Sequence, residues 1–283
     1  MYVCLMIIAK YNDFLEWEEI VGNNTHNIMM ICYQRCLVKL ISMLIIFLVA
    51  IIAGSYPFLK RLGSERGREF PIGESLAAGV FLGAGLLHML GDSAQEFNQL
   101  GYHYPIPFLL AGIMFLFLLW LEHLGREMQE HKGAGHPGFA VLAFVMLSIH
   151  SFLAGAALGL SATWSVFIVI FLAILAHKWA ASFALAVQIT KTTMSNKVGM
   201  LMFLVFALMT PFGILVGSVI NQGTQHMPLL EPIFSALAAG TFLYLGTLHG
   251  LSNAIMVQKC CNLRNFSFVI VGFAVMAVVA VWS

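Results

Sequence analysis

The chain has 283 residues, of which 60% are hydrophobic and only 10% are charged, with 14 Lys and Arg against 13 Asp and Glu. A soluble domain carries about 25% charged and roughly 45–50% apolar residues, so the composition excludes a soluble globular enzyme, a nucleic-acid-binding protein and a disordered chain. The nearly balanced charge points to no acidic partner. We therefore expect an all-α, polytopic integral membrane protein that partners a lipid bilayer.

The predicted elements begin after an N-terminal extension, residues 1–40, to which the sequence assigns no function. Crossing a hydrocarbon core of about 30 Å requires about 20 mostly apolar residues, and residues 41–283 contain eight such stretches. None alternates with the period of two that marks a membrane β-barrel. The eight predicted spans are Ile41–Leu59, Ser75–Gly91, Pro105–Leu121, Gly138–Leu160, Trp164–Thr190, Val198–Ile220, Pro232–Leu251 and Asn265–Trp282.

Basic residues orient these spans. Ten of the 14 Lys and Arg lie in the loops that follow the first, third, fifth and seventh spans, and the loops after the second, fourth and sixth contain none. The positive-inside rule places the basic loops in the cytoplasm. With eight spans, both termini are then extracytoplasmic, and we expect the plasma membrane, or the inner membrane in a bacterium.

Three more basic residues lie in the N-terminal extension, so 13 of the 14 lie outside the predicted spans. Lys178 is the exception, because it lies in the middle of the fifth span. A lysine at the centre of a membrane helix costs roughly 2.5–3.5 kcal/mol on insertion scales. Snorkelling to the interface is the alternative explanation, but it suits residues near a helix end. Lys178 is therefore expected to have a specific partner or role.

Histidines are also placed inside predicted spans, at His88, His150, His177 and His249. The fourth and fifth spans are joined only by residues 161–163, so we predict a tight turn and two antiparallel neighbouring helices. His150 lies about eleven residues before that turn and His177 about thirteen after it, which at 1.5 Å per residue gives similar depths. Two facing imidazoles could bind a divalent ion such as zinc; the alternative is two hydrogen-bonded packing residues.

Two other groups of polar residues could meet a metal. His88 and Asp92 are four residues apart on one helix face, where they could form an ion relay near the outer end or only a local hydrogen bond. The cytoplasmic loop at about residues 122–138 could weakly collect metal, the alternative being a solvated loop. Its histidines are His123, His131 and His136.

Glycines spaced four residues apart predict close helix packing. Gly155 and Gly159 form one GxxxG step in the fourth span, and Gly79 and Gly83 form another in the second. Such steps are common in membrane helices, so they indicate a close approach and carry no functional information.

Four segments, in the same order, resemble motifs of the ZIP (zinc/iron-regulated-transporter-like) family. His150-Ser151 opens an HSxxxGxxxG pattern, and His177-Lys178 resembles the HK-type fifth helix of that family. The second span, from Gly79 through His88 to Asp92, and the AGTFLY segment at residues 239–244 are similar to its second and seventh helices. The resemblance covers about residues 41–283.

The resemblance implies a divalent-metal transporter and not an enzyme. In this family the ion is imported to the cytoplasm as substrate, zinc foremost and Fe²⁺, Mn²⁺ or Cd²⁺ in some members, with no separate cofactor. It implies a metal site between the fourth and fifth helices, a homodimer, and a movement of helices one, four, five and six against the others.

Departures from the family pattern change the expected site. Many members carry Glu where this chain has Ala154 and Ala181, and an acidic residue where it has His249. Lys178 stands where two-metal members have a ligand for the second ion. Because an ammonium repels a nearby dication, we expect one metal ion at most, with the ammonium in place of the second cation.

The expected ligands of that ion are His150, His177, Ser151 and water, and Met146 could add a thioether from one helical turn earlier. The predicted path enters past Asp92 and His88 and leaves past His249. Two alternatives remain open at this point.

The first alternative is an intramembrane zinc-dependent hydrolase. Such an enzyme usually needs three protein ligands and a carboxylate base, whereas the fourth and fifth spans contain no Asp or Glu. The second alternative is a non-transporting membrane protein that senses metal or only packs. The missing carboxylates keep this one open.

Overall fold

A computed structural model of the chain describes residues 24–62, 70–127, 138–161, 163–223, 228–247 and 263–281. All regular secondary structure in these ranges is helical, as the composition predicted. The chain divides into two compact units, Met1–Ile45 and Ile46–Ser283. Helix α2 (Asn24–Leu62) contributes to both, and every other described helix belongs to the second unit.

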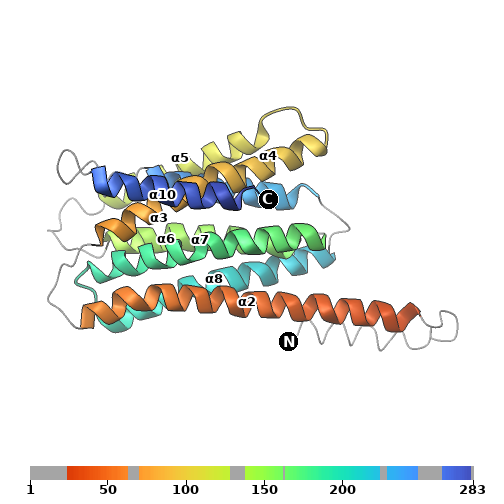
Figure 1. Ribbon diagram of the computed structural model, residues 1–283, viewed down its shortest axis with the longest axis horizontal. Helices are drawn as coiled ribbons and strands as arrows, with labels where there is room; N and C mark the ends of the chain where they lie inside the picture. Colours follow the sequence, from red (N-terminus) through yellow and green to blue (C-terminus); the bar gives the residue numbers. More distant parts are fainter. Residues whose placement is uncertain are drawn as a thin grey trace. The chain divides into compact units, whose positions relative to one another are not determined.

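The second unit contains, after α2, a helix interrupted by a π-helical turn and then six further helices. Within this unit α3 lies beside α10, and α6 beside α8 (Figure 1). The elements are α3 (Pro71–Gly83), the π-helix η2 (Ala84–Met89), α4 (Leu90–Gln99), α5 (Ile106–Glu127), α6 (Gly138–Leu160), α7 (Trp164–Thr190), α8 (Asn196–Gly223), α9 (Leu230–Tyr244) and α10 (Leu263–Val279).

Six helical stretches of the described residues are long and apolar enough to cross a membrane. They coincide with the first six predicted spans, while the seventh and eighth predicted spans fall on the shorter α9 and α10. The six are Cys36–Leu59, Pro71–Gln99, Ile106–Leu124, Ala140–Leu160, Trp164–Thr190 and Asn196–Asn221.

Burial separates central from peripheral helices. In an 18-residue apolar stretch of each span, 61% of the α6 stretch is buried inside the structure, against 22% of the α5 stretch. Large apolar side chains of α5, among them Phe108, Leu116 and Trp120, are exposed. Such a surface suits contact with lipid, because exposed apolar area of this extent is costly in water. The functional residues of α6 therefore lie in the interior of the bundle.

Glycines allow the closest helix contacts. A Cβ added at Gly155 or Gly159 of α6 would collide with backbone carbonyls of α8, at Thr210 and Ile214. A Cβ added at Gly79 of α3 would likewise collide with a backbone carbonyl of α10. The close approach predicted from both GxxxG steps is confirmed, and it brings the backbones of α6 and α8 together.

The predicted tight turn between the fourth and fifth spans is confirmed. Helix α6 ends at Leu160 and α7 begins at Trp164. The hydroxyl of Thr163 accepts a hydrogen bond from the backbone N–H of Val166 at 3.4 Å, as expected of a helix N-cap. This geometry makes α6 and α7 an antiparallel pair.

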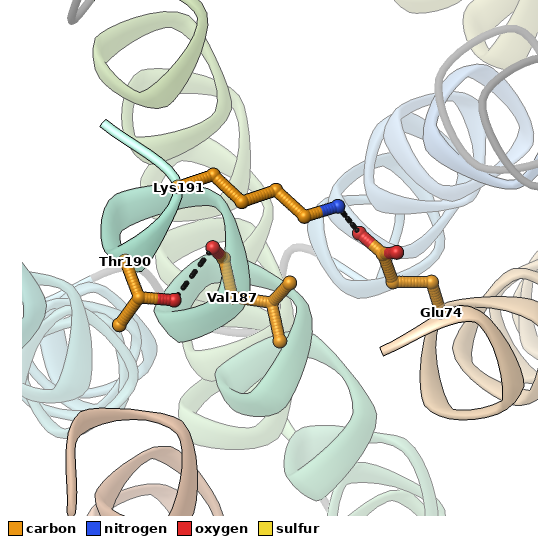
Figure 2. A network of polar contacts seen from close by, with 4 residues as sticks. All are labelled: Glu74, Val187, Thr190 and Lys191. Atoms are coloured by element: carbon orange, nitrogen blue, oxygen red, sulfur yellow. Dashed lines mark hydrogen bonds and ion pairs between the residues drawn. The ribbon is translucent and has the colours of Figure 1, made fainter. Parts of the chain in front are cut away.

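The other end of α7 is tied to the start of α3. Lys191, directly after α7, forms an ion pair with Glu74 of α3, with Nζ and Oε1 2.5 Å apart (Figure 2). Just inside, the rings of Phe70 and Phe183 meet edge to face with centroids 5.8 Å apart. This end of α7 is therefore closed against α3 by an aromatic contact and a charge pair.

Candidate metal centre

The two histidines predicted to face each other are brought together. His150 on α6 and His177 on α7 are buried, with exposed fractions of 2% and 1%. Their ring centroids are 5.6 Å apart and the rings are nearly perpendicular, at 71°. Two imidazoles that bind one zinc ion through nitrogens at ~2.0–2.1 Å place their ring centres about 5–6 Å apart. The observed separation therefore suits a single shared divalent ion.

Helix α9 forms the third wall of this centre. Nδ1 of His150 lies 2.7 Å from Oγ1 of Thr241 and 3.2 Å from the carbonyl oxygen of Ala238. The next residue, Phe242, stacks on His150 with centroids 3.5 Å apart and meets His177 edge to face at 4.9 Å. The Thr and Phe of the AGTFLY segment thus hold the two imidazole rings.

Lys178 forms a second, cationic part of the centre. Its ammonium is buried, donates hydrogen bonds to Oγ of Ser151 (3.0 Å) and Oγ1 of Thr210 (2.8 Å), and lies 4.2 Å from the centre of the Phe206 ring. Two hydroxyls and an aromatic face compensate for the lost hydration of this charge. Lys178 therefore stays in the interior and does not snorkel.

The side chains that could bind a metal ion together with the two histidines are neutral. Among the residues that the structure describes, no three His, Cys, Asp or Glu side chains gather into a metal-binding group. Met146 is fully buried one turn before His150, and the positions without Glu, Ala154 and Ala181, are also buried. The buried ring of His177 hydrogen-bonds to the backbone carbonyl of Ala173, one helical turn earlier. A neutral imidazole that donates one N–H keeps a lone pair on its other nitrogen, so this ring can bind an ion that arrives as substrate.

A cavity of about 290 Å³ lies on the side of the α6–α7 turn. His88, in the π-helix η2, forms an ion pair with Asp92, with Nδ1 and Oδ2 2.5 Å apart. The predicted contact between these two residues is confirmed, and π-helical turns are frequent at functional sites. The lining residues are His88, Met89, Asp92, Gln95, Glu96, Gln99, Ala154, Ala157, Ser165, Val166, Val169, Ile170, Ile174, Glu231 and Ser235.

The cavity ends one helical turn from the two histidines. Ala154 lies four residues after His150, and Ile174 lies three residues before His177, so a rise of 1.5 Å per residue puts them about 6 Å and about 4.5 Å from the two histidines along their helices. The cavity therefore reaches to about one helical turn from the centre, and its residue His88 is close enough to His177 to interact with it electrostatically.

The remaining predicted site residues lie elsewhere. His123 is exposed on α5, which extends to Glu127, and its Nδ1 is 3.0 Å from the carbonyl oxygen of Leu119 in the same helix. The residues around it that the structure describes are thus helical. His131, His136 and His249 lie outside the described residues.

Known proteins give an independent comparison. The family profile described as ZIP Zinc transporter matches residues 127–280, just over half of the chain. The chain belongs to the ZIP family. It is 29% identical to the zinc transporter ZIP2 of Mus musculus over 259 residues, which cover 73% of this chain and 84% of that protein. It is 26% identical to zinc transporter 11 of Arabidopsis thaliana over an alignment that covers 87% of this chain and 85% of that protein.

Several residues of this ZIP centre were not among those predicted. Thr210 and Phe206 around Lys178, and Thr241 and Phe242 around His150, belong to helices far away in the sequence. Glu231, in the cavity, directly precedes the seventh predicted span, and an acidic residue at a helix start was the one available signal for it.

Proposed function

We propose that this ZIP family member carries a divalent metal ion, zinc foremost, across a lipid bilayer, with His150 and His177 as its central ligands. The observation that carries the proposal is the pair of buried imidazoles facing each other from α6 and α7, 5.6 Å apart. The relatives described as zinc transporters support zinc as the transported substrate.

The ligand set is one of neutral donors for a single ion. The two imidazoles are complemented by water, with the thioether of Met146 available one turn away. The oxygen of Ser151 accepts a hydrogen bond from Lys178, so we assign it to the ammonium and only secondarily to the ion. Few anionic ligands mean moderate affinity, which favours transport because the ion must also leave. Protons compete with the ion for the same nitrogens.

Lys178 replaces a second metal ion in this proposal. Its ammonium is fixed directly beside His177 in the chain by two hydroxyls and the Phe206 ring. Coulomb repulsion in a poorly solvated interior amounts to several kcal/mol between such a charge and a nearby dication. The centre therefore holds one ion.

The ion reaches the centre through the cavity. Asp92, which contacts His88, attracts a cation to the cavity. Burial, and then the nearby Glu96, raises the pKa of Glu231 to about 8, so its carboxyl is largely protonated at neutral pH and becomes an anion when a cation displaces that proton. The ion then passes Ala154 and Ile174 to the centre, and we propose that it leaves past His249.

Orientation follows from charge. The cavity lies at the α6–α7 turn, whereas the basic Lys191 lies at the opposite end of α7. The positive-inside rule assigns the Lys191 end to the cytoplasm, so the cavity faces the outside and the ion is imported. We accordingly propose eight spans, extracytoplasmic termini and a plasma-membrane location. Family resemblance supports a homodimer.

The hydrolase alternative finds no support at this centre. It required three protein ligands and a carboxylate base, and the described residues next to His150 and His177 on their own helices include Ala154 and Ala181 where a carboxylate would serve. We therefore propose transport alone.

Zinc uptake into proteoliposomes of purified protein tests this function. We expect His150→Ala and His177→Ala each to reduce uptake to the level of empty liposomes, whereas His123→Ala, which removes an exposed ring on α5, leaves uptake unchanged. Wild-type uptake that persists in both central variants would overturn the proposed site. Zinc binding by the wild type without uptake would instead favour the sensor alternative.

A further inference from the structure

The Nδ1 side of the His150 ring faces two oxygen atoms of α9. Oγ1 of Thr241 lies 2.7 Å away and the carbonyl oxygen of Ala238 lies 3.2 Å away. Both contacts are buried and both connect α6 to a helix about 90 residues later in the chain. The hydrogen-bonding direction of this small group decides which nitrogen of His150 is free.

The proton of Thr241 is already used. Its hydroxyl donates to the carbonyl oxygen of Ala238 at 2.6 Å, and a hydroxyl has only one proton to donate. Thr241 therefore presents lone pairs to His150, and the carbonyl oxygen of Ala238 can only accept. Both neighbours of Nδ1 are thus acceptors, so Nδ1 must carry the proton. In a neutral imidazole the lone pair is then on Nε2.

The stacked ring of Phe242 fixes the orientation that Thr241 selects. It lies 3.5 Å from the His150 ring and nearly parallel to it, at 17°, so the imidazole cannot turn over without losing both contacts. In the part of the chain that the structure describes, no side chain hydrogen-bonds to Nδ1 of His177, and the ring hydrogen-bonds to the backbone carbonyl of Ala173, one turn earlier in α7. A neighbouring side chain therefore acts on the tautomer of His150 and not on that of His177.

We propose that Thr241 is a positioning residue that holds His150 in the Nδ1–H tautomer and thereby presents Nε2 to the transported ion. This inference rests on the proposed function for its purpose, but the tautomer itself is a property of the metal-free protein. Groups that orient a ligating histidine in this way typically contribute 10–100-fold to metal affinity. Valine, which has nearly the same shape, would leave the Nδ1 proton only the longer contact of 3.2 Å to the carbonyl oxygen of Ala238, so the preference for the Nδ1–H tautomer would weaken.

Nitrogen NMR of the metal-free protein in lipid, labelled with ¹⁵N-histidine, tests the proposal directly. The signals that disappear in His150→Ala identify His150. We expect a protonated Nδ1 and an unprotonated Nε2 in the wild type and in Thr241→Ser, and a mixture of tautomers in Thr241→Val. Zinc affinity should fall about tenfold in Thr241→Val and recover in Thr241→Ser.

Thr247→Val is the matched control, because that hydroxyl donates to the carbonyl oxygen of Leu243, one turn earlier in the same part of the chain. It should leave the His150 signals and zinc affinity unchanged. A Thr241→Val spectrum identical to that of the wild type, or a Thr241→Ser protein that behaves like Thr241→Val, would overturn the inference. Uptake that is independent of His150 would refute the proposed function but would leave the tautomer result standing.

Discussion

The cavity and the proposed metal centre differ in the charge of their side chains. The cavity is lined by Asp92, Glu96 and Glu231. The centre, one helical turn deeper, offers two neutral imidazoles and a fixed ammonium, Lys178. Carboxylates suit the capture of a hydrated cation, whereas neutral ligands beside a positive charge suit its release.

This contrast gives each region a distinct functional signature. Changes in the cavity should alter how fast the ion is captured, and should depend on ionic strength because the field of partly exposed charges is screened. Changes at the centre should alter how tightly the ion is held. The predictions below run in decreasing order of expected effect, and the last tests a contact outside both regions.

Replacing the ammonium should produce the largest change. In Lys178→Met we expect zinc to bind tenfold or more tightly, since the repulsion between the ammonium and the dication is removed, while maximal uptake falls because release slows. Ser151 and Thr210 can turn their hydroxyls to carbonyls of their own helices, so the fold should persist in a thermal melt. Zinc titration of the metal-free protein measures the affinity.

Lys197→Met is the control for Lys178→Met, because it removes an exposed positive charge at the start of α8. Lys197→Met should leave the zinc affinity unchanged. Restoring carboxylates, in Ala154→Glu with Ala181→Glu and Lys178→Asp, should raise the zinc stoichiometry of the centre from one to two. A titration that still gives one ion would contradict the role of the ammonium as a substitute cation.

Neutralising the cavity should have a smaller effect. Asp92→Asn removes a negative charge and the partner of His88. We expect kcat/KM for zinc uptake to fall about tenfold at low salt. This loss should become smaller at high salt, because salt screens the charge. Glu127→Gln is the control, at an exposed position at the end of α5. It should change neither kcat/KM nor its dependence on salt. A loss in Asp92→Asn that is the same at all salt concentrations would argue against an attractive role for the cavity.

Separating the far end of α7 from α3 should have the smallest effect. The Glu74–Lys191 pair is partly exposed (Figure 2), so Glu74→Gln should cost ~1 kcal/mol or less of stability. The charge-reversed double variant Glu74→Lys with Lys191→Glu should regain it, as measured by thermal melts. A loss of several kcal/mol would show that this end is coupled to the centre more strongly than a partly exposed ion pair.

Short-range sequence patterns predicted the parts of the site that lie on one helix or one hairpin. His88 and Asp92 meet because they are four residues apart, and His150 and His177 meet because a three-residue turn sets their depths. Ser151 stays a predicted metal ligand, and its hydrogen bond from Lys178 is a contact that the sequence did not predict.

The partners from distant helices could not be predicted in this way. Thr210 and Thr241 are small polar residues in apolar helices, and neither has a spacing that links it to Lys178 or His150. Their placement depends on which helices pack together, and that depends on glycines such as Gly155 of α6 and Gly213 of α8 interlocking across the bundle. The GxxxG pattern predicts a close contact but does not identify the partner helix.

The central claim is that one metal ion lies between His150 and His177. Anomalous diffraction from crystals soaked in zinc measures this most directly. We predict a single zinc peak between the two imidazoles, within ligand distance of Nε2 of His150 and absent from the ammonium of Lys178. No peak between the two rings, or two peaks with one beside Lys178, would contradict the account.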